Sequence, residues 1–388
     1  MEYLLEDLFD LQMGKTPSRK NPDYWNSNDN KWISIGDISR CGKYISDTKE
    51  YISNRAVSDS GISLIPENTV IMSFKLSIGK TAITLEPMYS NEAIMSFKDK
   101  HIVELLPDYI YYMFLAKNWN EGSNKAVKGT TLNKATLSKI RIKVHNINEQ
   151  IIIAKTLDKL QSIINHRKQQ LLKLDELVKA RFVEMFGEPV SNTMNWDTVP
   201  LGKLTTKIGS GATPKGGRET YGTEGISLIR SMNVHNGYFE YKDLAYISDE
   251  QAKKLDNVIV HDKDVLLNIT GASVARCCIV PDNILPARVN QHVCIIRCKA
   301  DVSSIFLCSV LTDDNFQNLL WNIAGSGATR EAITKQQVES LSIIVPPIAL
   351  QQQFATFVAQ IDKSKVVVQK ALDEAQLLFD SLMQECFG

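Results

Sequence analysis

The sequence predicts an α+β protein in which two similar mixed α/β globular domains are joined by two long antiparallel coiled-coil helices with pseudo-twofold symmetry. Three observations lead to this fold class. The second half of the chain repeats the first, each half ends in a long segment without glycine or proline, and short β-rich runs fill the rest. A chain of 388 residues also suits two domains of roughly 100–200 residues each.

The repeat is clearest in the two closing segments. The letters EMFG at 184–187 return as ECFG at 385–388, which is an offset of 201 residues. At the same offset Gln150 meets Gln351, and most positions between such matches exchange one aliphatic residue for another. Earlier parts of the halves match at slightly shorter offsets, which indicates small insertions. Because a period of roughly 200 residues is too long for a solenoid repeat, we interpret the chain as a duplicated domain.

The first part of each half is predicted to be globular. Runs such as NTVIMSF at 68–74 and DVLLNIT at 264–270 indicate strands, and Gly, Pro, Asn and Asp separate them. Interspersed helical stretches, such as PDYIYYMFLAKNW at 107–119, indicate a mixed domain. We expect globular domains at 1–148 and 188–347, a central spacer helix at 149–187 and a C-terminal spacer helix at 348–388.

The last segment of each half is predicted to be one long helix. Neither 149–186 nor 348–387 contains Gly or Pro, and apolar residues recur in steps of four and three, which defines a heptad seam. We expect Asn148 to cap the first helix and the proline pair before Ile348 to start the second. The seam residues expected at the interface are Ile153, Leu157, Leu160, Ile164, Leu171, Leu174, Phe354, Val358, Ile361, Val368, Leu372 and Phe379.

A helix of this length cannot bury its seam alone, and its own copy is the obvious partner. Two equivalent segments related by a pseudo-twofold axis would pack antiparallel. Arg167 and Lys365 interrupt the two seams, once in each copy, which would fix the register at some cost in stability. The alternative is that each helix packs separately on its own domain.

Composition limits the classes of function. The chain has 44 Lys and Arg against 44 Asp and Glu, whereas a nucleic-acid-binding protein is usually basic overall. The acid-free stretch between Glu121 and Glu149 is nevertheless basic, and it would be either solvated or partner-facing. No apolar run reaches the ~18 residues of a membrane span, and the N-terminus is acidic. We therefore expect a cytoplasmic protein without a membrane segment.

Motifs for catalysis or metal binding are not found. The GKT at 79–81 has Phe74 where a phosphate-binding loop requires glycine. The NPDY at 21–24 resembles the catalytic Asn-Pro-Pro-Tyr turn of amino-methyltransferases, but Asp23 replaces the second proline and no cofactor loop accompanies it. The seven cysteines include no CxxC pair, which favours free buried thiols in a reducing compartment. We therefore expect neither catalytic nor metal-binding residues in this chain.

A duplicated domain carried on paired helices presents two similar surfaces at a fixed distance. This arrangement suits a DNA duplex, where half-sites about one helical turn (~34 Å) apart present equivalent grooves. Divergence between the globular copies suits two different sequences, and preservation of the helices suits a fixed separation. The remaining alternatives are a binding module of another class, such as a stand-alone DNA-binding protein or an adaptor, and an enzyme with an unrecognised site.

Several motifs, in the same order in both halves, resemble a known family. They are GKTP to YW at 14–25 and GATP to Y at 211–221, WISIGDI at 32–38, SLIRSMNV at 227–234, DVLLNITGASVAR at 264–276, NQH at 290–292 and GATREAITKQQVESLSIIVPPIALQQQ at 327–353. With the closing helices they resemble the specificity subunit of type I restriction–modification enzymes over essentially the whole chain. The first half departs from the pattern, with VKGT at 127–130 and His145-Asn146 where the second half has GATR and a proline pair.

This resemblance implies a non-catalytic subunit that reads double-stranded DNA. Each half would contain a target-recognition domain for one part of a split, asymmetric sequence, and the helical spacer would set the gap. The resemblance also implies two modification (methyltransferase) subunits that bring S-adenosylmethionine and methylate adenine. Restriction subunits that use ATP and Mg would join them. This chain itself would bind no cofactor, and wrapping of the duplex by its partners would explain the neutral charge.

The residues expected to contact DNA are basic or polar side chains around the Thr-Pro turns and in nearby loops. Arginine and lysine pair either with guanine edges or with phosphates, and the alternative for each is a solvated surface charge. Thr16-Pro17 and Thr213-Pro214 themselves are expected to be structural turns. The expected DNA contacts are Lys15, Ser18, Arg19, Lys20, Tyr24, Lys75, Lys80, Lys215, Arg218, Tyr221, Arg230 and Arg276.

Overall fold

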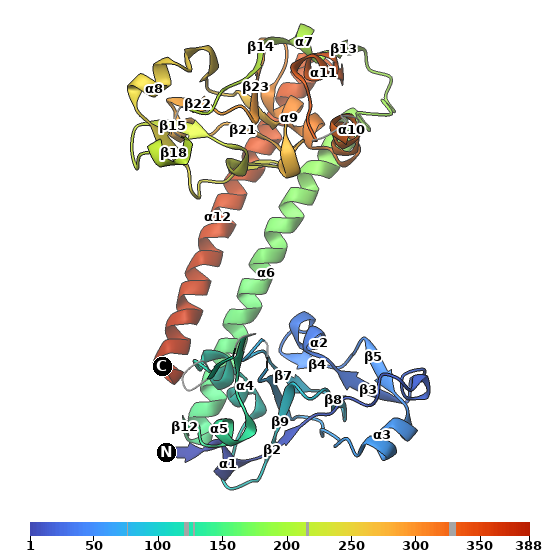
Figure 1. Cartoon of the computed structure of the whole chain (residues 1–388). Helices are drawn as coiled ribbons and strands as arrows, with labels where there is room; N and C mark the ends of the chain where they lie inside the picture. The colour runs from blue at the N-terminus through green and yellow to red at the C-terminus, as the bar shows by residue number, and fades with distance from the viewer. Residues whose placement is uncertain (76, 120–123, 127–128, 215–216, 326–330) are drawn as a thin grey trace. The chain divides into compact units, whose positions relative to one another are not determined.

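The computed structural model of the protein describes residues 1–75, 77–119, 124–126, 129–214, 217–325 and 331–388. The chain forms two compact units, of which unit 1 comprises Met1–Lys168 with Lys370–Gly388 and unit 2 comprises Gln169–Gln369. We call residues 1–146 head 1 and residues 187–347 head 2. Each unit therefore contains one head together with half of each long helix (Figure 1).

Unit 1 is built from short strands and helices. Its strands are β1 (Glu2–Leu4), β2 (Phe9–Met13), β3 (Asn30–Ile33), β4 (Tyr44–Ile45), β5 (Glu50–Ile52), β6 (Val70–Ser73), β7 (Thr81–Thr84), β8 (Tyr89–Ser90), β9 (Ile94–Asp99), β10 (Asn124–Ala126), β11 (Gly129–Thr131) and β12 (Arg141–Lys143). Its helices are α1 (Leu5–Leu8), η1 (Pro22–Tyr24), α2 (Ile35–Arg40), α3 (Asn54–Ser60), α4 (Pro107–Ala116), α5 (Lys134–Ser138) and the first part of α6 (Ile147–Phe186).

Unit 2 has a closely related set of elements. Its strands are β13 (Thr198–Pro200), β14 (Thr205–Ser210), β15 (Ile226–Ile229), β16 (Val234–His235), β17 (Tyr238–Phe239), β18 (Ala245–Ile247), β19 (Ile259–Val260), β20 (Val265–Asn268), β21 (Cys277–Ile279), β22 (Ala287–Val289), β23 (Val293–Cys298) and β24 (Ser342–Ile344). Its helices are α7 (Leu201–Leu204), η2 (Gly217–Thr220), η3 (Ser231–Asn233), α8 (Asp249–Lys253), η4 (Asp256–Val258), η5 (Gly271–Ser273), η6 (Asp282–Ile284), α9 (Ser304–Thr312), α10 (Asp314–Gly325), α11 (Lys335–Ser340) and the first part of α12 (Ile348–Phe387).

The two heads share one sheet topology. The order β2-β9-β6-β7 in head 1 corresponds to β14-β23-β20-β21 in head 2, and β5-β3-β8 corresponds to β18-β15-β22. In these three-strand orders the first pair is antiparallel and the second pair is parallel in both heads. Head 1 adds β4 beside β7, whereas head 2 adds β19 beside β22. The internal repeat in the sequence is therefore a repeat of architecture with different edge strands.

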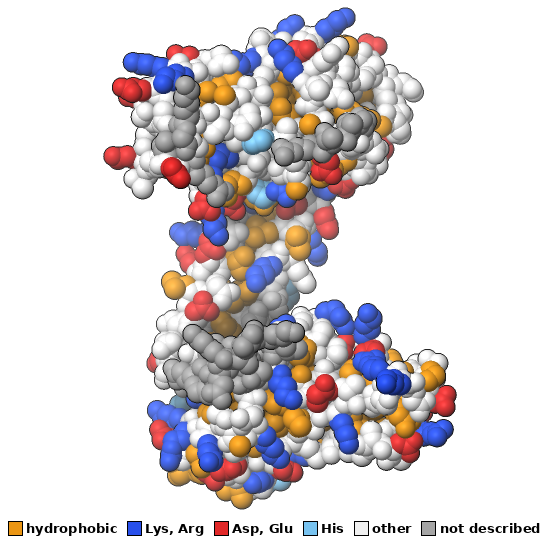
Figure 2. All heavy atoms as spheres, in the orientation of Figure 1, with side chains coloured by type: hydrophobic (Ala, Val, Ile, Leu, Met, Phe, Trp, Pro, Cys, Tyr) orange, Lys and Arg blue, Asp and Glu red, His pale blue; other side chains and the backbone are white. Residues whose placement is uncertain are grey.

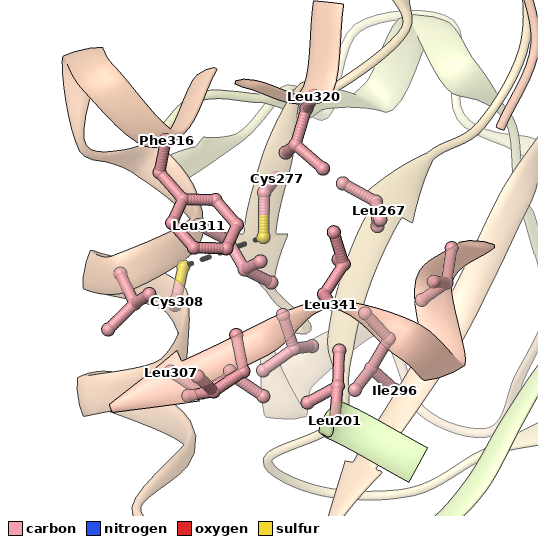
Figure 3. Close-up of a cluster of buried hydrophobic side chains, with 14 of the residues drawn as sticks. Leu201, Leu267, Cys277, Ile296, Leu307, Cys308, Leu311, Phe316, Leu320 and Leu341 are labelled. Atoms are coloured by element: carbon pink, nitrogen blue, oxygen red, sulfur yellow. Dashed lines mark hydrogen bonds between the residues drawn. The ribbon is translucent and has the colours of Figure 1, made fainter. Parts of the chain in front are cut away.

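Each head buries an apolar core between its sheets and helices. In head 1, Phe9, Phe97 and Phe114 meet edge to face beneath α4. In head 2, helices α9 and α10 cover the sheet β14-β23-β20-β21, and leucines, isoleucines and cysteines fill the space between them (Figure 3). The Sγ atoms of Cys277 and Cys308 lie 4.0 Å apart there, and burial raises the pKa of the Cys277 thiol. All seven cysteines are free thiols, and Cys277, Cys278, Cys294 and Cys308 are buried.

The two long helices have identifiable ends. Helix α6 begins at Ile147, where Asn146 Oδ1 accepts a hydrogen bond from Glu149 N at 3.0 Å. The expected cap, Asn148, was therefore wrong, because that residue already lies in the first turn and Asn146 forms the capping box instead. At the other end Gly187 has φ +74° and a Cβ there would lie 2.4 Å from Thr193 Oγ1. Helix α12 starts directly after the proline pair, as expected.

Within each unit the halves of the long helices run antiparallel. In unit 2 the ring of Phe354 lies 5.6 Å from that of Phe182, and further along Lys365 Nζ lies 2.6 Å from Asp175 Oδ1. In unit 1 Phe387 packs against the core of head 1, close to the start of α6. The helices therefore pack on each other in unit 2 and on the heads in both units.

Candidate nucleic-acid interface

Each Gly-x-Thr-Pro turn follows the first long strand of its head. A Cβ on Gly14 would lie 2.2 Å from the Asn91 carbonyl oxygen, and one on Gly211 would lie 1.7 Å from the Val289 carbonyl oxygen. No side chain fits at either distance, so glycine is required for the chain to cross the strand beneath it. The first residue of each turn, Gly14 or Gly211, therefore has a structural role.

A second turn, at 91–93 in head 1 and at 290–292 in head 2, contacts the Thr-Pro turn. The Asn91 and Asn290 amides donate at 3.0 Å to the carbonyl oxygens of the preceding sheet strands β3 and β15. Their side chains accept from the amide two residues later, again at 3.0 Å in each head. The residue between those two positions is Glu92 in head 1 and Gln291 in head 2, and both side chains are exposed.

This intervening residue holds the Thr-Pro turn. The Thr16 hydroxyl donates to the Glu92 carboxylate, and the Thr213 hydroxyl donates to the Gln291 side-chain oxygen. The hydrogen bond from Thr16 lowers the pKa of Glu92 despite partial burial, and the nearby charges of Lys75 and Arg19 contribute in the same direction. The same contact thus occurs twice, once with an ionised acid and once with a neutral amide.

In head 1 the expected DNA contact Arg19 belongs to an aromatic and ionic cluster. Its guanidinium lies 3.6 Å from the centroid of the Trp25 ring, and Nη2 donates to Glu50 Oε2 at 3.0 Å. The Trp25 ring meets Trp32 edge to face at 4.9 Å. The hydrogen bond from Arg19 lowers the pKa of Glu50, and Glu50 raises that of Arg19. The guanidinium is therefore held in place while half of the side chain remains exposed.

Two other residues that are expected to contact DNA, Lys15 and Tyr24, form hydrogen bonds with the end of helix α3. Lys15 Nζ donates to the Ser60 carbonyl oxygen at 2.5 Å, and the Tyr24 hydroxyl donates to Asp59 at 2.9 Å. Ser18 and Lys20 are exposed beside them. The residues at 15–24 that are expected to contact DNA therefore lie around the Thr-Pro turn of head 1. Lys75 interacts electrostatically with Glu92, which binds the same turn.

Lys80 lies elsewhere on head 1, but it has a counterpart in head 2. Its Nζ donates to Ser39 Oγ at 2.5 Å. The residue before it, Gly79, has φ +88°, and Ala275, which precedes Arg276, has φ +71°. In both heads this turn is closed by a hydrogen bond to the carbonyl of the last residue of a central strand. Lys80 and Arg276 therefore occupy equivalent half-buried positions.

The expected contacts in head 2 are less fully described. Arg230 lies 5.5 Å from the Tyr221 ring centroid and donates to the Asp243 carbonyl oxygen. Lys215 and the Arg218 side chain lie outside the part of the chain that the structure describes. So does the GATR at 327–330 on which the family resemblance partly rests.

The expected helix-interface residues are all buried or half-buried. Other apolar residues of the two helices, such as Ile152 (65% exposed) and Val366 (69%), are exposed. The buried seam residues are Leu157, Leu160, Ile164, Phe354 and Leu372, and the half-buried ones are Ile153, Leu171, Leu174, Val358, Ile361, Val368 and Phe379.

Charges of both signs are mixed on the face of the molecule that Figure 2 shows. Blue and red side chains are interspersed on the visible face of each head (Figure 2). Among the described residues, no group of His, Cys, Asp and Glu has the arrangement of a metal site. None of the described helices combines the length and apolar character of a membrane span.

The turn residues Asn91 and Glu92 were not predicted from the sequence. A signal was present, because Asn91-Glu92 precedes the β-rich run of the first half as Asn290-Gln291 precedes that of the second. The tryptophan pair beside Arg19 has no equivalent in the second half, so the repeat could not point to it.

Comparisons with known proteins agree over the length of the chain. A family model described as the type I restriction modification DNA specificity domain matches residues 1–174 and 194–375. The chain is 23% identical over 401 residues to the type I restriction enzyme MjaIX specificity subunit of Methanocaldococcus jannaschii, covering 98% of this chain and 90% of that one. It is 27% identical over 179 residues to the EcoR124I/EcoR124II specificity subunit of Escherichia coli, covering 44% and 43%.

Solved structures share the fold. The S subunit of a type I restriction–modification system from M. genitalium matches with a TM-score of 0.61 at 13% identity, covering 100% of this chain and 96% of that one. A chain from a structural study of assembly and conformational transition of the type I system matches with a TM-score of 0.60 at 15% identity, covering 100% and 97%. The predicted fold class, two similar α/β domains with coiled-coil helices, is confirmed.

Proposed function

This chain belongs to the family of type I restriction–modification DNA specificity subunits, and we propose that head 1 and head 2 each read one half of a split, asymmetric DNA sequence. A specificity subunit is the DNA-recognition component of its system and is not catalytic. The observation that carries the proposal is that both heads contain the same Gly-x-Thr-Pro turn. Gly14 and Gly211 cross their strands in the same way, while the side chains displayed on the turns differ. One scaffold with two sets of side chains suits two different half-sites.

The long helices would set the gap between the half-sites. Residues 1–148 and 188–347 would act as the recognition domains, and 149–187 and 348–388 as the spacers. A helix of 40 residues rises ~60 Å, which exceeds the ~34 Å of one turn of DNA. The spacers would also dock two modification subunits carrying S-adenosylmethionine, and restriction subunits would add ATP-driven cleavage.

The DNA contacts would come from the basic and polar residues already named around the Thr-Pro turns. Arg19 supports this role best, because Trp25 and Glu50 hold its guanidinium in one orientation while leaving it partly exposed. A preorganised guanidinium loses little side-chain entropy on binding a guanine edge or a phosphate. The neutral net charge fits a reader whose partners neutralise many of the phosphates.

The proposal is tested by measuring duplex binding by this chain with and without its modification subunit. We expect tight, sequence-selective binding for the complex, because the partners would add phosphate contacts to those of this chain. Equal and salt-insensitive affinity of the complex for all duplexes would contradict the proposal. Methyl transfer by the isolated chain would contradict the assignment of catalysis to the partner.

Independent reading by the heads has its own test. Residues 188–345 are exchanged for the equivalent segment of a related subunit, and the methylated sites are then sequenced. One half of the recognised sequence should change while the other half is retained. Insertion of a helical turn into α6 should instead lengthen the gap. A change of both half-sites after the domain exchange would show that the heads do not read independently.

A further inference from the structure

We propose that Glu92 and Gln291 read a base edge in the major groove, Glu92 by accepting from the amino group of a cytosine and Gln291 by pairing with an adenine. The inference rests on the proposed function, since it assigns one base-reading residue to each head. It concerns two residues that the sequence did not mark as DNA contacts. They occupy one position on a shared scaffold and differ in chemistry.

The scaffold beneath the two residues is rigid and repeated. The asparagine before each one is held by hydrogen bonds of both its backbone amide and its side chain. These bonds fix the backbone at Glu92 and Gln291, and therefore the orientation of the Cα–Cβ bond of each residue. The threonine of the neighbouring turn then bonds to the side-chain oxygen. A side chain that is exposed yet held from two sides loses little conformational entropy when it meets a base.

The chemistry of each side chain selects a different edge. An ionised carboxylate only accepts hydrogen bonds, and the amino group of cytosine is the lone donor which that base presents in the major groove. The lowered pKa keeps Glu92 ionised. A glutamine side chain has both a donor and an acceptor, which matches the acceptor and amino group of adenine.

The surroundings of each residue are consistent with these roles. An acid at a DNA interface is repelled by phosphates, but the positive charges of Lys75 and Arg19 act directly on Glu92 and offset that repulsion. In head 2 no charge compensation is needed for an amide. There Gln291 Nε2 lies 3.1 Å from His292 Nε2, and His292 Nδ1 lies 2.5 Å from Thr270 Oγ1, so the amide is oriented by a chain of polar contacts.

The alternative role for Glu92 and Gln291 is only to hold the Thr-Pro turn. Thr16→Val separates the two roles, because it removes the hydroxyl that bonds to Glu92 and leaves the carboxylate in place. A holding role predicts that Thr16→Val weakens binding of all duplexes and that Glu92→Gln behaves like the wild type, because a glutamine oxygen still accepts from the threonine, as Gln291 does from Thr213. A reading role predicts that only the substitution at residue 92 changes which base is selected.

The test uses the complex of this chain with its modification subunits and a duplex library randomised over both half-sites. Bound duplexes are sequenced for the wild type, Glu92→Gln, Gln291→Glu and Thr16→Val. We expect Glu92→Gln to change one position in the half-site of head 1 from cytosine to adenine, with roughly 10–100-fold weaker binding of the original site, as for loss of one good base contact. Gln291→Glu should change one position of the other half-site in the opposite sense, and Thr16→Val should leave base preferences unchanged.

Each result decides between the readings. Uniform loss of affinity across all duplexes, an unchanged base preference, or the same shift in Thr16→Val and Glu92→Gln would overturn the inference. If the wild-type complex selects no split sequence, the proposed function itself fails. If it selects one that the variants leave intact, only the inference fails. Both residues are exposed, and an unchanged unfolding temperature for each variant confirms that its effect is not a loss of folding.

Discussion

The two heads are attached to the same pair of helices by different chemistry. In unit 1, Lys43 Nζ lies 2.5 Å from Asp108 Oδ1 and 2.7 Å from Asp158 Oδ1, and Asp158 belongs to α6. The hydroxyl of Tyr112 donates to the same Asp158 oxygen at 2.6 Å. The Lys43 side chain is only 12% exposed. An ionic network therefore ties head 1 to its spacer helix.

In unit 2 the corresponding junction is aromatic. The rings of Phe182, Phe186, Phe306 and Phe354 form one cluster, with centroid separations of 4.9–5.9 Å between its contacting pairs. All four side chains are buried. Two of these rings come from α6, one from α12 and one from α9 of head 2. Head 2 is therefore attached by apolar packing.

One contact is shared by both junctions. Gln150 Oε1 accepts from Leu106 N at 3.0 Å, and Gln351 Oε1 accepts from Ser303 N at 2.9 Å. Both glutamines are fully buried, and each clamps the segment that leads into the helix covering its head. Duplication thus preserved a backbone-directed hydrogen bond, which depends only on topology. The side chains around this contact differ, because Lys43 and Asp158 form an ionic network in unit 1 and four phenylalanines form a cluster in unit 2.

The largest expected effect is on the aromatic junction. Phe354→Ala should destabilise unit 2 by about 3–5 kcal/mol, as for other buried phenylalanines, because its ring meets both Phe182 and Phe186. Hydrogen exchange of peptides from each unit measures the effect separately. Phe357→Ala, at a half-buried position on the same helix, serves as the control and should cost less than half as much. Equal losses in both units would contradict an independent aromatic junction.

The ionic junction should be the next most sensitive. Lys43→Met removes the ammonium and leaves Asp108 and Asp158 without their shared cation, which should cost about 2–4 kcal/mol in unit 1. Hydrogen exchange in α4 should increase while the peptides of head 2 stay protected. Lys203→Met offers a control, because that lysine lies on the exposed surface of head 2. A neutral outcome for Lys43→Met would mean that the network is dispensable for holding head 1.

Acid should discriminate between the units. The hydrogen bonds from Lys43 and Tyr44 lower the pKa of Asp108 although burial opposes them, and the pKa values of Glu50 and Glu92 are also lowered. A lowered folded-state pKa gives stability that is present above the unfolded value and lost as the pH falls through the folded value. Unit 1 should therefore lose protection as the pH falls below ~4.5, near the ordinary carboxyl pKa values.

In unit 2 the carboxyl of Asp313 should contribute to stability in the opposite sense as the pH falls. Burial raises the pKa of Asp313, so its protonation favours the folded form as the pH falls. Exchange of both units followed from pH 6 to pH 3.5 checks this difference. Simultaneous loss of protection in the two units would remove pH as a distinction between them.

The smallest effect is expected at the charged pair between the helices. Lys365→Ala removes the contact with Asp175, whose side chain is 60% exposed, and should change the stability of unit 2 by only about 0–1 kcal/mol. Its apparent unfolding temperature at low and high salt gives the measurement. A loss above 2 kcal/mol would mean that this pair, rather than the aromatic cluster, holds the helices together.

The sequence predicted the parts of this structure that depend on local periodicity. Heptad spacing identified both long helices, and the proline pair fixed the start of α12. Alternating β-rich runs and turn residues predicted the mixed heads. Asn146 was missed as the cap because Asn148 has the same side chain two residues later, and only the backbone path distinguishes them.

The candidate site was predictable only in part. The glycine and threonine of each turn were visible because they repeat. The partner of Arg19 was not, since Glu50 comes from a strand far along the chain and pairs with it only after the sheet has formed. The same holds for Lys43 and Asp158, which lie in segments without mutual periodicity. Contacts between distant side chains require the fold before they can be recognised.

The position of Phe387 has a consequence for biosynthesis. Its ring lies 5.3 Å from that of Tyr109 and packs against the core of head 1. A ribosome delivers Tyr109 early and Phe387 only after all of head 2, so head 1 receives this half-buried packing partner last. During that interval its unfilled apolar surface is exposed to chaperones and to neighbouring nascent chains. The order of translation and the order of completion are thus reversed.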